Sequence, residues 1–426
     1  MSDLETLKRV MPAESLTPAT VGSSMWSVHK AGMWLDEALW TAPFAPPARP
    51  TTTTAAAASM GNGRDVAVAS VESPFASMEV IVGISQWVQA EAYRFAYQAG
   101  RRRKWHRSLM ASWTFDEPWP NAAHGCVVDY YGLPKHAFYT VKQANQMLDV
   151  SLSYSNILAP PGERLQATVW VDSELSVAKE CVVEVYYFTP AGDDLGSERI
   201  AAAAPNPRGP KASTGTTSRF EVPAATATKL QQLQYAPSAK QEGDVVIVRL
   251  ALLCMADDEG LPGKETLAAT NDYTFGIKSP QIQIPHDQSE PSVASDSAGA
   301  AASVASTGGP LRAMLAVAST ALSLTIGGTP SAPVLHVTTT SANATSGSPC
   351  ALYVKPTLRN ATHPAGHQLG YVSFSNGFVT LRPGESVALR LLSAGVLSAG
   401  GAASPGTMAC VEAWNAPRVC VPLSIV

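Results

Sequence analysis

The chain has 426 residues, 46% of them hydrophobic and 15% charged, which is enough for about three domains of ordinary size. Its 30 Lys and Arg residues against 34 Asp and Glu residues give a formal net charge of −4. This balance argues against a nucleic-acid-binding protein, which normally carries a basic face. The one basic run, Arg101 to Lys104, is interpreted as the solvated end of a helix.

The six cysteines form no CxxC pair, so we expect no zinc or other metal site, and the sequence gives no sign of a cofactor. Cys350, Cys410 and Cys420 lie in the last segment and could pair in a secreted protein, with buried free thiols as the alternative. No uncharged apolar run free of Gly and Pro reaches the roughly 18 residues of a membrane span. The first residues, Met-Ser-Asp-Leu-Glu, lack the apolar core of a signal peptide, and the location stays open between lysosome, secretion and cytoplasm.

In chain order, the first feature is a low-complexity stretch over 45–71, which is interpreted as a disordered insertion. Residues 77–103 carry apolar side chains at helical spacing and predict an amphipathic helix. The almost uncharged run over 108–115 is typical of a strand buried on both faces. A loop rich in Pro, Asn and Gly follows over 116–132, and a second helix is predicted over 134–148.

Near Val150 the hydrophobic period changes from helical to alternating. Short alternating segments separated by turn signals such as Pro161-Gly162 are typical of β-sandwiches. We therefore expect immunoglobulin-like sandwiches over 150–280 and 311–426. A disordered linker rich in Ser, Ala and Gly is expected over 281–310.

The front segment, residues 1–149, has an α/β pattern but is too short for a complete (β/α)8 barrel, which needs about 250 residues. If it belongs to a barrel, it can hold only the last part. The predicted fold class is therefore α/β followed by all-β, with the last quarter of a TIM (β/α)8 barrel preceding two immunoglobulin-like β-sandwich domains.

Several motifs follow one another in a fixed order: Gln89–Arg94 (QAEAYR), Trp113–Pro120 (WTFDEPWP) and Val128–Lys135 (VDYYGLPK). This succession resembles the end of the catalytic barrel in glycoside hydrolase family 2, in the branch of the β-mannosidases and exo-β-glucosaminidases. There the eighth strand reads like Trp-x-Phe-Asn-Glu-x-Trp-Pro, so Asp116 departs from the usual Asn. Tyr371–Phe378 resembles part of the final immunoglobulin-like domain of these enzymes. Each motif is weak alone, whereas the ordered set is specific.

The resemblance implies a retaining mechanism, which needs two carboxyl groups about 5–5.5 Å apart. In the family both are glutamates, at the ends of barrel strands four and seven. Leu4–Arg9 resembles the segment shortly after strand seven, so the resemblance implies that both glutamates lie upstream of Met1. Asp116 and Glu117 are adjacent and thus poorly arranged to flank a glycosidic bond from opposite faces. No catalytic residue is therefore assigned.

The candidate substrate-binding residues lie in one short segment: Trp113, Asp116, Glu117 and Trp119. The resemblance implies that Trp113 lines the sugar subsite, where an apolar ring can cover the C–H face of a sugar. A core tryptophan is the alternative. For Asp116 and Glu117 the alternative is a pair of polar groups that end a strand and bind loop amides. His29 and His124 could bind sugar hydroxyls or be ordinary surface histidines.

The resemblance implies an exo-acting retaining β-glycosidase that hydrolyses terminal β-mannosides. This chain alone is expected to be inactive, because it lacks both glutamates. A β-linked carbohydrate is the expected partner, and nucleic acid and membrane are not. The alternative function is a non-catalytic carbohydrate-binding or interaction protein built of β-sandwich modules. Which sugar is removed (mannose, glucosamine or galactose) and the oligomeric state stay open.

Overall fold

The structure of the protein is a computed structural model. It describes residues 1–17, 24–29, 42–45, 75, 77–200, 219–241, 243–256, 264–277, 309–329, 332–340, 348–361, 368–394 and 406–423. The insertion predicted over 45–71 and the linker predicted over 281–310 lie almost entirely outside the described residues. None of the described helices is long and apolar enough to cross a membrane.

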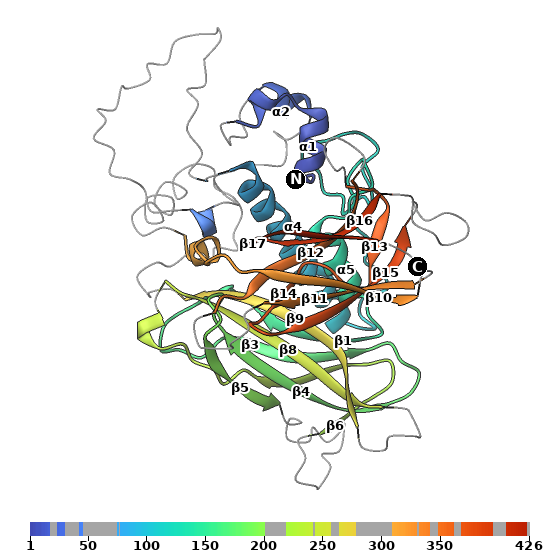
Figure 1. Ribbon diagram of the computed structural model, residues 1–426. Coiled ribbons are helices and arrows are strands. Elements are labelled where there is room, and N and C mark those ends of the chain that lie inside the picture. Colours follow the sequence, from blue (N-terminus) through green and yellow to red (C-terminus); the bar gives the residue numbers. More distant parts are fainter. Residues whose placement is uncertain are drawn as a thin grey trace, which may run out of the picture.

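The helical part of the fold comes from the front of the chain (Figure 1). Among the described residues, its α-helices are α1 (Leu4–Val10), α2 (Ser24–Val28), α4 (Met78–Arg102) and α5 (His136–Ala144). Helix α4 confirms the helix predicted over 77–103, and it begins where the side chain of Ser77 accepts a hydrogen bond from the amide of Val80. The second predicted helix is present but shorter, because the chain becomes a strand at Leu148.

The buried strand predicted over 108–115 is wrong. These residues have no regular secondary structure, and the side chains of Leu109 and Trp113 are 81% and 84% exposed. A strand needs a neighbour for its backbone N–H and C=O groups, and no described strand pairs with this run. The apolar composition of these residues therefore indicates a tendency to be buried, but it does not show whether another strand is present to pair with them.

The first sandwich begins at Leu148, close to the predicted change of period at Val150. One of its sheets has the strand order β1-β3-β7. The strands of this sheet are β1 (Leu148–Tyr154), β3 (Ala167–Ser173) and β7 (Ala227–Gln232). The other sheet has the order β2-β9-β8-β4-β5, with β6 paired to β4. Its strands are β2 (Leu158–Ala159), β4 (Lys179–Phe188), β5 (Asp194–Ile200), β6 (Phe220–Val222), β8 (Val245–Met255) and β9 (Glu265–Ile277).

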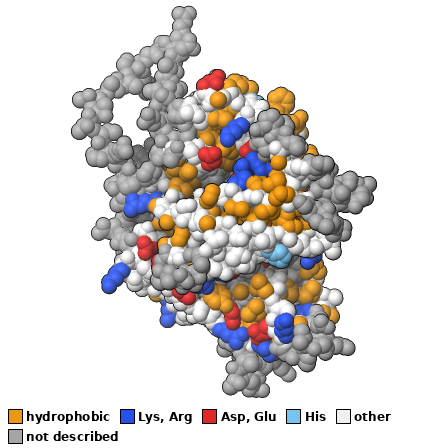
Figure 2. All heavy atoms as spheres, in the orientation of Figure 1, with side chains coloured by type: hydrophobic (Ala, Val, Ile, Leu, Met, Phe, Trp, Pro, Cys, Tyr) orange, Lys and Arg blue, Asp and Glu red, His pale blue; other side chains and the backbone are white. Residues whose placement is uncertain are grey.

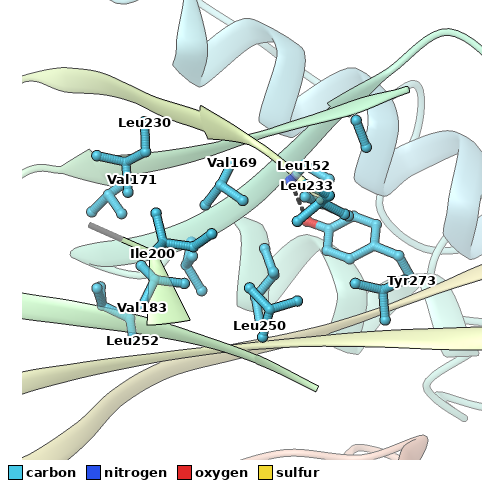
Figure 3. Close-up of a cluster of buried hydrophobic side chains, with 14 of the residues drawn as sticks. Leu152, Val169, Val171, Val183, Ile200, Leu230, Leu233, Leu250, Leu252 and Tyr273 are labelled. Carbon is cyan, nitrogen blue, oxygen red and sulfur yellow. Dashed lines mark hydrogen bonds between the residues drawn. The ribbon is translucent and has the colours of Figure 1, made fainter. Parts of the chain in front are cut away.

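The core of this sandwich is filled by side chains from the inner faces of both sheets (Figure 3). Val169 and Val171 come from β3, and Leu250 and Leu252 come from β8. Each pair is two residues apart, as expected where alternate residues of a strand face the core. Tyr273 is buried at one side, where its hydroxyl accepts a hydrogen bond from the amide of Leu152 at 3.1 Å.

The second sandwich is formed by the last part of the chain. Its two sheets have the orders β10-β11-β15-β13 and β14-β12-β16-β17. The strands are β10 (Leu322–Thr329), β11 (Ala332–Thr339), β12 (Ala351–Asn360), β13 (Val372–Phe374), β14 (Val379–Leu381), β15 (Ser386–Ala394), β16 (Thr407–Ala413) and β17 (Ala416–Pro422). The chain is thus mostly β-structure, as predicted for the region after Val150.

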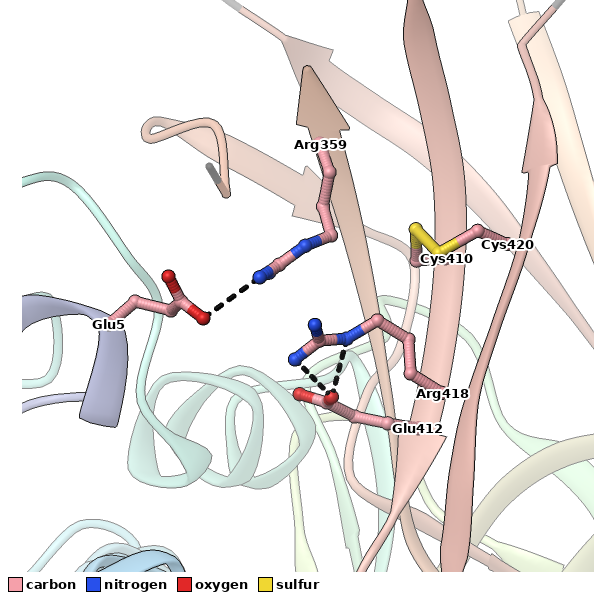
Figure 4. The surroundings of a disulfide bond; sticks show 6 residues. All are labelled: Glu5, Arg359, Cys410, Glu412, Arg418 and Cys420. Carbon is pink, nitrogen blue, oxygen red and sulfur yellow. Dashed lines mark hydrogen bonds and ion pairs between the residues drawn. A yellow bond between two sulfur atoms is a disulfide. The ribbon is translucent and has the colours of Figure 1, made fainter. Parts of the chain in front are cut away.

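Two disulfides correct the interpretation of the cysteines. Cys181 and Cys254 are bonded between β4 and β8, where they are directly opposite each other in the strand register. Cys410 is bonded to Cys420 between β16 and β17 (Figure 4). Cys126 and Cys350 are free and buried, so only one of the anticipated pairings within the last segment is present.

The helices pack against both sandwiches rather than forming a separate body. Their apolar core includes Trp87 of α4, Ile247 of the first sandwich and Leu352 of the second. Helix α1 is also tied to β12, because Glu5 binds Arg359 at 2.8 Å (Figure 4). In the space-filling view, hydrophobic side chains gather over the middle of the face shown, between the helical end and the first sandwich (Figure 2).

The two sandwiches are joined by a charged cluster around Arg249 of β8. The guanidinium binds both oxygens of Asp272, Nε to Oδ1 at 2.7 Å and Nη2 to Oδ2 at 2.8 Å. Its Nη1 binds both oxygens of Glu385, in the β14–β15 turn, at 2.8 Å, and its Nη2 donates to the carbonyl of Thr380 at 2.6 Å. The opposite charges of Asp272 and Glu385 raise the pKa of Arg249 although burial opposes this. Arg249 therefore links the two sandwiches and stays charged.

The basic run at the end of α4 was interpreted from the sequence as a solvated helix end, and this interpretation is wrong. Three of its four side chains are partly buried against the first sandwich. Arg101 donates to the carbonyls of Ala144 and Gln146 at 2.8 and 2.6 Å, and Arg102 donates to that of Leu152 at 3.1 Å. Cations at a helix C-terminus are favoured by the helix dipole, and here they also bind carbonyl oxygens of neighbouring segments.

Candidate functional site

The candidate site is the irregular segment between α4 and α5, where all four predicted substrate-binding residues lie. Its backbone is anchored at a few points. The amides of Val127 and Val128 both donate to the carbonyl of Phe115 at 3.1 Å, and the amide of Lys135 donates to the carbonyl of Val127 at 2.9 Å. These bonds hold the segment that carries Trp113 beside the segment that leads into α5.

Three of the four predicted residues lie on the surface. Trp113 is 84% exposed and Trp119 is 55% exposed, so neither is the core tryptophan that the alternative interpretation required. Asp116 is exposed as well, although its backbone forms a bridge with Val128. The peptide bond between Trp113 and Thr114 is cis. The loop therefore presents two indole rings and one carboxylate outward.

Glu117 is different, because its side chain is fully buried. It binds Nζ of Lys135 at 2.5 Å, and both side chains have no exposed surface. The second carboxylate oxygen of Glu117 has no hydrogen-bond partner within the described part of the chain. Glu117 thus holds the loop against the start of α5 rather than facing a ligand, which agrees with the structural alternative considered for it.

The buried thiol of Cys126 contacts three other residues of the loop. Sγ of Cys126 lies 2.8 Å from Oγ1 of Thr114 and 3.1 Å from Nδ1 of His124, and it donates to the carbonyl of Asp116 at 3.2 Å. His124 is therefore engaged within the loop. His29 is buried, with Nδ1 at 2.8 Å from the carbonyl of Pro120, so it is not the surface histidine that was considered.

Helix α4 supports the loop from one side. Nε2 of Gln89 donates to the carbonyls of Gly125 and Cys126 at 2.9 and 3.1 Å, and the hydroxyl of Tyr93 donates to that of Gly125 at 2.8 Å. Burial raises the pKa of Tyr93, which keeps its hydroxyl protonated as a donor. Gln89 and Tyr93 are four residues apart and therefore lie on one face of the helix. Both belong to the Gln89–Arg94 motif, whose sequence pattern alone did not indicate a role for them in the site.

The turn before α5 is fixed by Asp129. Its Oδ1 accepts hydrogen bonds from the amides of Tyr131 and Leu133 at 3.0 and 2.9 Å, and its Oδ2 accepts one from Thr6 of α1. Burial raises the pKa of Asp129, and these donors act in the opposite direction. Gly132 has a φ of +75°, and an added Cβ would lie 2.8 Å from Tyr371 of the second sandwich. The Asp-Tyr-Tyr-Gly sequence thus fits both the turn and the close approach.

The exposed side chains of this loop are of types that can contact a sugar. Exposed indole rings can cover the apolar face of a sugar, and Asp116 can accept hydrogen bonds from hydroxyls. The loop offers no second free carboxylate opposite Asp116, because Glu117 is bound to Lys135. Among the described residues, no three His, Cys, Asp or Glu side chains gather so that they could hold a metal ion.

A separate cleft of about 940 Å³ lies between the two sandwiches, and it does not include the predicted residues. Its polar lining includes Arg249, Asp272 and Glu385, which bind one another. The four predicted residues are therefore brought together by their place in one loop, and none of them lines this cleft.

No protein-family model matches the chain. In sequence, the chain is 29% identical over 140 residues to β-mannosidase B of Aspergillus terreus. It is 31% identical over 136 residues to β-mannosidase B of Emericella nidulans. These matches cover 30% and 29% of this chain and 16% of each relative, so only a small part of the relatives is represented.

In structure, the chain is similar to the exo-chitosanase of Amycolatopsis orientalis solved with PNP-β-D-glucosamine. The TM-score is 0.61 at 16% identity, over 99% of this chain and 41% of that chain. Another structure of the same enzyme matches 82% of this chain and 35% of its own length, with a TM-score of 0.54 at 17% identity. Sequence and fold together show that the chain resembles the C-terminal region of the β-mannosidase and exo-glucosaminidase branch of glycoside hydrolase family 2.

Proposed function

We propose that this chain is the part of an exo-acting retaining β-mannosidase that presents an aromatic sugar subsite, while both catalytic glutamates lie on polypeptide outside residues 1–426. The observation that carries the proposal is the loop of residues 113–120. It has the ordered motif of the family, its two tryptophans are exposed, and its buried Glu117 is bound to Lys135. The similarity to β-mannosidases and to an exo-chitosanase supports a glycoside as the ligand.

The same loop supports the proposal that residues 1–149 form the end of a TIM barrel, with the sandwiches as separate domains after it. Leu109, Trp113 and Phe115 are exposed apolar side chains within eight residues of sequence. Large apolar side chains clustered on a surface commonly mark a contact with another part of a protein. In a complete barrel, residues outside this chain would lie against this segment and cover part of its exposed apolar surface, while Trp113 would lie at the mouth of the barrel.

We expect the purified chain alone to hydrolyse no aryl β-mannoside. The retaining mechanism needs a nucleophile and an acid on opposite sides of the bond, and the loop supplies neither. The assay compares this chain with a longer version of the protein that includes both family glutamate motifs, each with aryl β-mannoside and aryl β-glucosaminide. Turnover by the short chain that persists in a Glu117→Gln variant and after removal of contaminating glycosidases would overturn the proposal. Glycan binding without turnover in the longer protein would favour the non-catalytic alternative.

We expect Trp113→Ala to reduce turnover of the longer protein far more than it reduces stability. A side chain that is 84% exposed makes few contacts in this chain, so the free energy of unfolding should change by no more than about 0.5 kcal/mol. The measurements are kcat/KM for the aryl glycoside and the denaturation midpoint of the short chain. Trp105→Ala is a matched control, because Trp105 is 80% exposed and lies outside the motif. Equal turnover in the two variants would show that Trp113 does not line the subsite.

A further inference from the structure

Two buried aspartates face each other across neighbouring strands of the first sandwich. In the antiparallel register of β1 and β3, Asp149 is directly opposite Asp172. Directly opposite residues share one face of a sheet, with Cβ atoms about 4.5–5.5 Å apart. Val150 and Val171 face the core of the sandwich, so the two carboxyl groups face the other way, toward α4. Asp149 is 0% exposed and Asp172 is 1% exposed.

The two carboxyl groups have few hydrogen-bond donors. Asp149 accepts a bond from Nδ2 of Asn271 at 2.7 Å and another from Nε2 of Gln98 in α4 at 3.3 Å. Neither oxygen of Asp172 has a hydrogen-bond partner among the described residues. A buried carboxylate without donors is costly to ionise, and a second carboxylate opposite it increases that cost.

The charged groups that face the pair come mainly from the end of α4, and none of them forms an ion pair with either aspartate. Arg101 and Arg102 donate to carbonyls of neighbouring segments, as described above. Lys104 binds the carbonyl of Ser173 at 3.1 Å and also pairs with Glu174. The hydroxyl of Tyr273 is another nearby titratable group; it donates to Oε1 of Gln98 at 2.8 Å, and burial raises its pKa.

We propose that Asp149 and Asp172 hold a proton in the native protein, and that release of this proton loosens the contact between the C-terminal half of α4 and the β1-β3-β7 sheet. With the proton bound, at most one negative charge remains in the buried space. With both groups ionised, two negative charges face each other in the buried space, with hydrogen bonds from Gln98 and Asn271 to Asp149 only, while the cations at the end of α4 oppose this cost without forming an ion pair with either group. Because α4 also holds the candidate loop through Gln89 and Tyr93, the proton state of the pair is connected to the support of that loop.

Burial raises the pKa of Asp149 to about 6, and the charge of Arg101 opposes this. Burial, together with the charge of Asp149, raises the pKa of Asp172 to about 7. The native state therefore binds protons more tightly than the unfolded chain, in which an aspartate has a pKa of about 3.9. By linkage, the stabilisation is fully present below about pH 4 and is lost as the pH rises through about 6 to 7.

The experiment measures the unfolding equilibrium of the full chain from pH 4.5 to 8 in the native protein, Asp172→Asn and Asp149→Asn. Asn cannot ionise, so Asp172→Asn should match the native protein at pH 4.5. At pH 8 its unfolding constant should be smaller by on the order of 10²-fold. Glu163→Gln, which removes an exposed carboxylate from a turn of the same sandwich, should follow the native pH profile. Hydrogen exchange of α4 amides over 98–102, corrected for intrinsic rates, should show about tenfold more opening in the native protein at pH 8 than at pH 5.

Titration of the two carboxyl carbons by ¹³C NMR in the native protein is independent of whether either variant folds. Midpoints well above 4, present in the native protein and displaced for Asp149 in Asp172→Asn, are the expected result. Midpoints near 4 for both groups would overturn the proposal. So would an Asp172→Asn variant whose stability differs from the native protein by the same amount at every pH, since that indicates a structural role alone.

Discussion

Replacing Lys135 by Met is expected to destabilise the protein by about 3–5 kcal/mol, because it leaves the carboxylate of Glu117 buried without its counter-ion. The only hydrogen bond that the structure gives this carboxylate is the one from Lys135, and the other oxygen has no partner among the described residues. Chemical denaturation followed by circular dichroism measures the loss.

A second substitution separates the lost charge from lost packing. Adding Glu117→Gln to Lys135→Met removes the unpaired charge, so the double variant should be more stable than Lys135→Met alone. Lys8→Met, at an exposed position of α1, serves as the control and should change stability by less than about 0.5 kcal/mol. If the loss of stability in the double variant equals the sum of the losses in the two single variants, the ion pair does not hold the loop. Packing of the Lys135 side chain would then be what holds it.

The predictions that succeeded depend on patterns that a short segment carries by itself. Helix α4 has its apolar side chains at helical spacing and a Ser at its start, and both signals are local. The change to strands near Val150 is also visible in the alternation of a few residues. The sequence does not show which strands belong to which sheet of a sandwich, because strand order depends on contacts between distant residues.

The predictions that failed concern features that depend on contacts with residues distant in the sequence. Residues 108–115 have the composition of a buried strand, but a strand exists only beside another one, and none is described there. The Cys181–Cys254 bond joins residues 73 positions apart, which only the pairing of β4 with β8 brings together. The basic end of α4 looked solvated because the carbonyls that it binds belong to other segments.

For the candidate site, the sequence indicated a segment but not the contacts that its residues make. The motif placed Trp113 and Trp119 in one loop, and both are exposed there. The motif did not distinguish Asp116 from Glu117, although one is exposed and the other is buried against Lys135. Adjacent residues of an irregular loop can point in opposite directions, and only the position of Lys135 decides which one is turned inward.

Replacing Arg249 by Met is expected to destabilise the protein by about 2–4 kcal/mol. The substitution leaves Asp272 and Glu385 facing each other across the contact between the sandwiches, without the cation that both bind. The expected loss is smaller than for a fully buried pair, because the side chains of Asp272 and Glu385 are 22% and 38% exposed and water screens part of their charge.

The location of the effect distinguishes a link between the sandwiches from a local contact. If Arg249 joins the two sandwiches, hydrogen-exchange protection in Arg249→Met should fall both in β9 and in the β14–β15 turn, which belong to different sandwiches. Glu385→Gln should cost less than Arg249→Met, since the amide can still accept a hydrogen bond and Asp272 keeps its partner. Arg164→Met, at an exposed turn position, controls for the loss of a guanidinium as such. Loss of protection confined to β8 and β9 would mean that the ion cluster stabilises only the first sandwich, and that the apolar core shared with the helices holds the two sandwiches together.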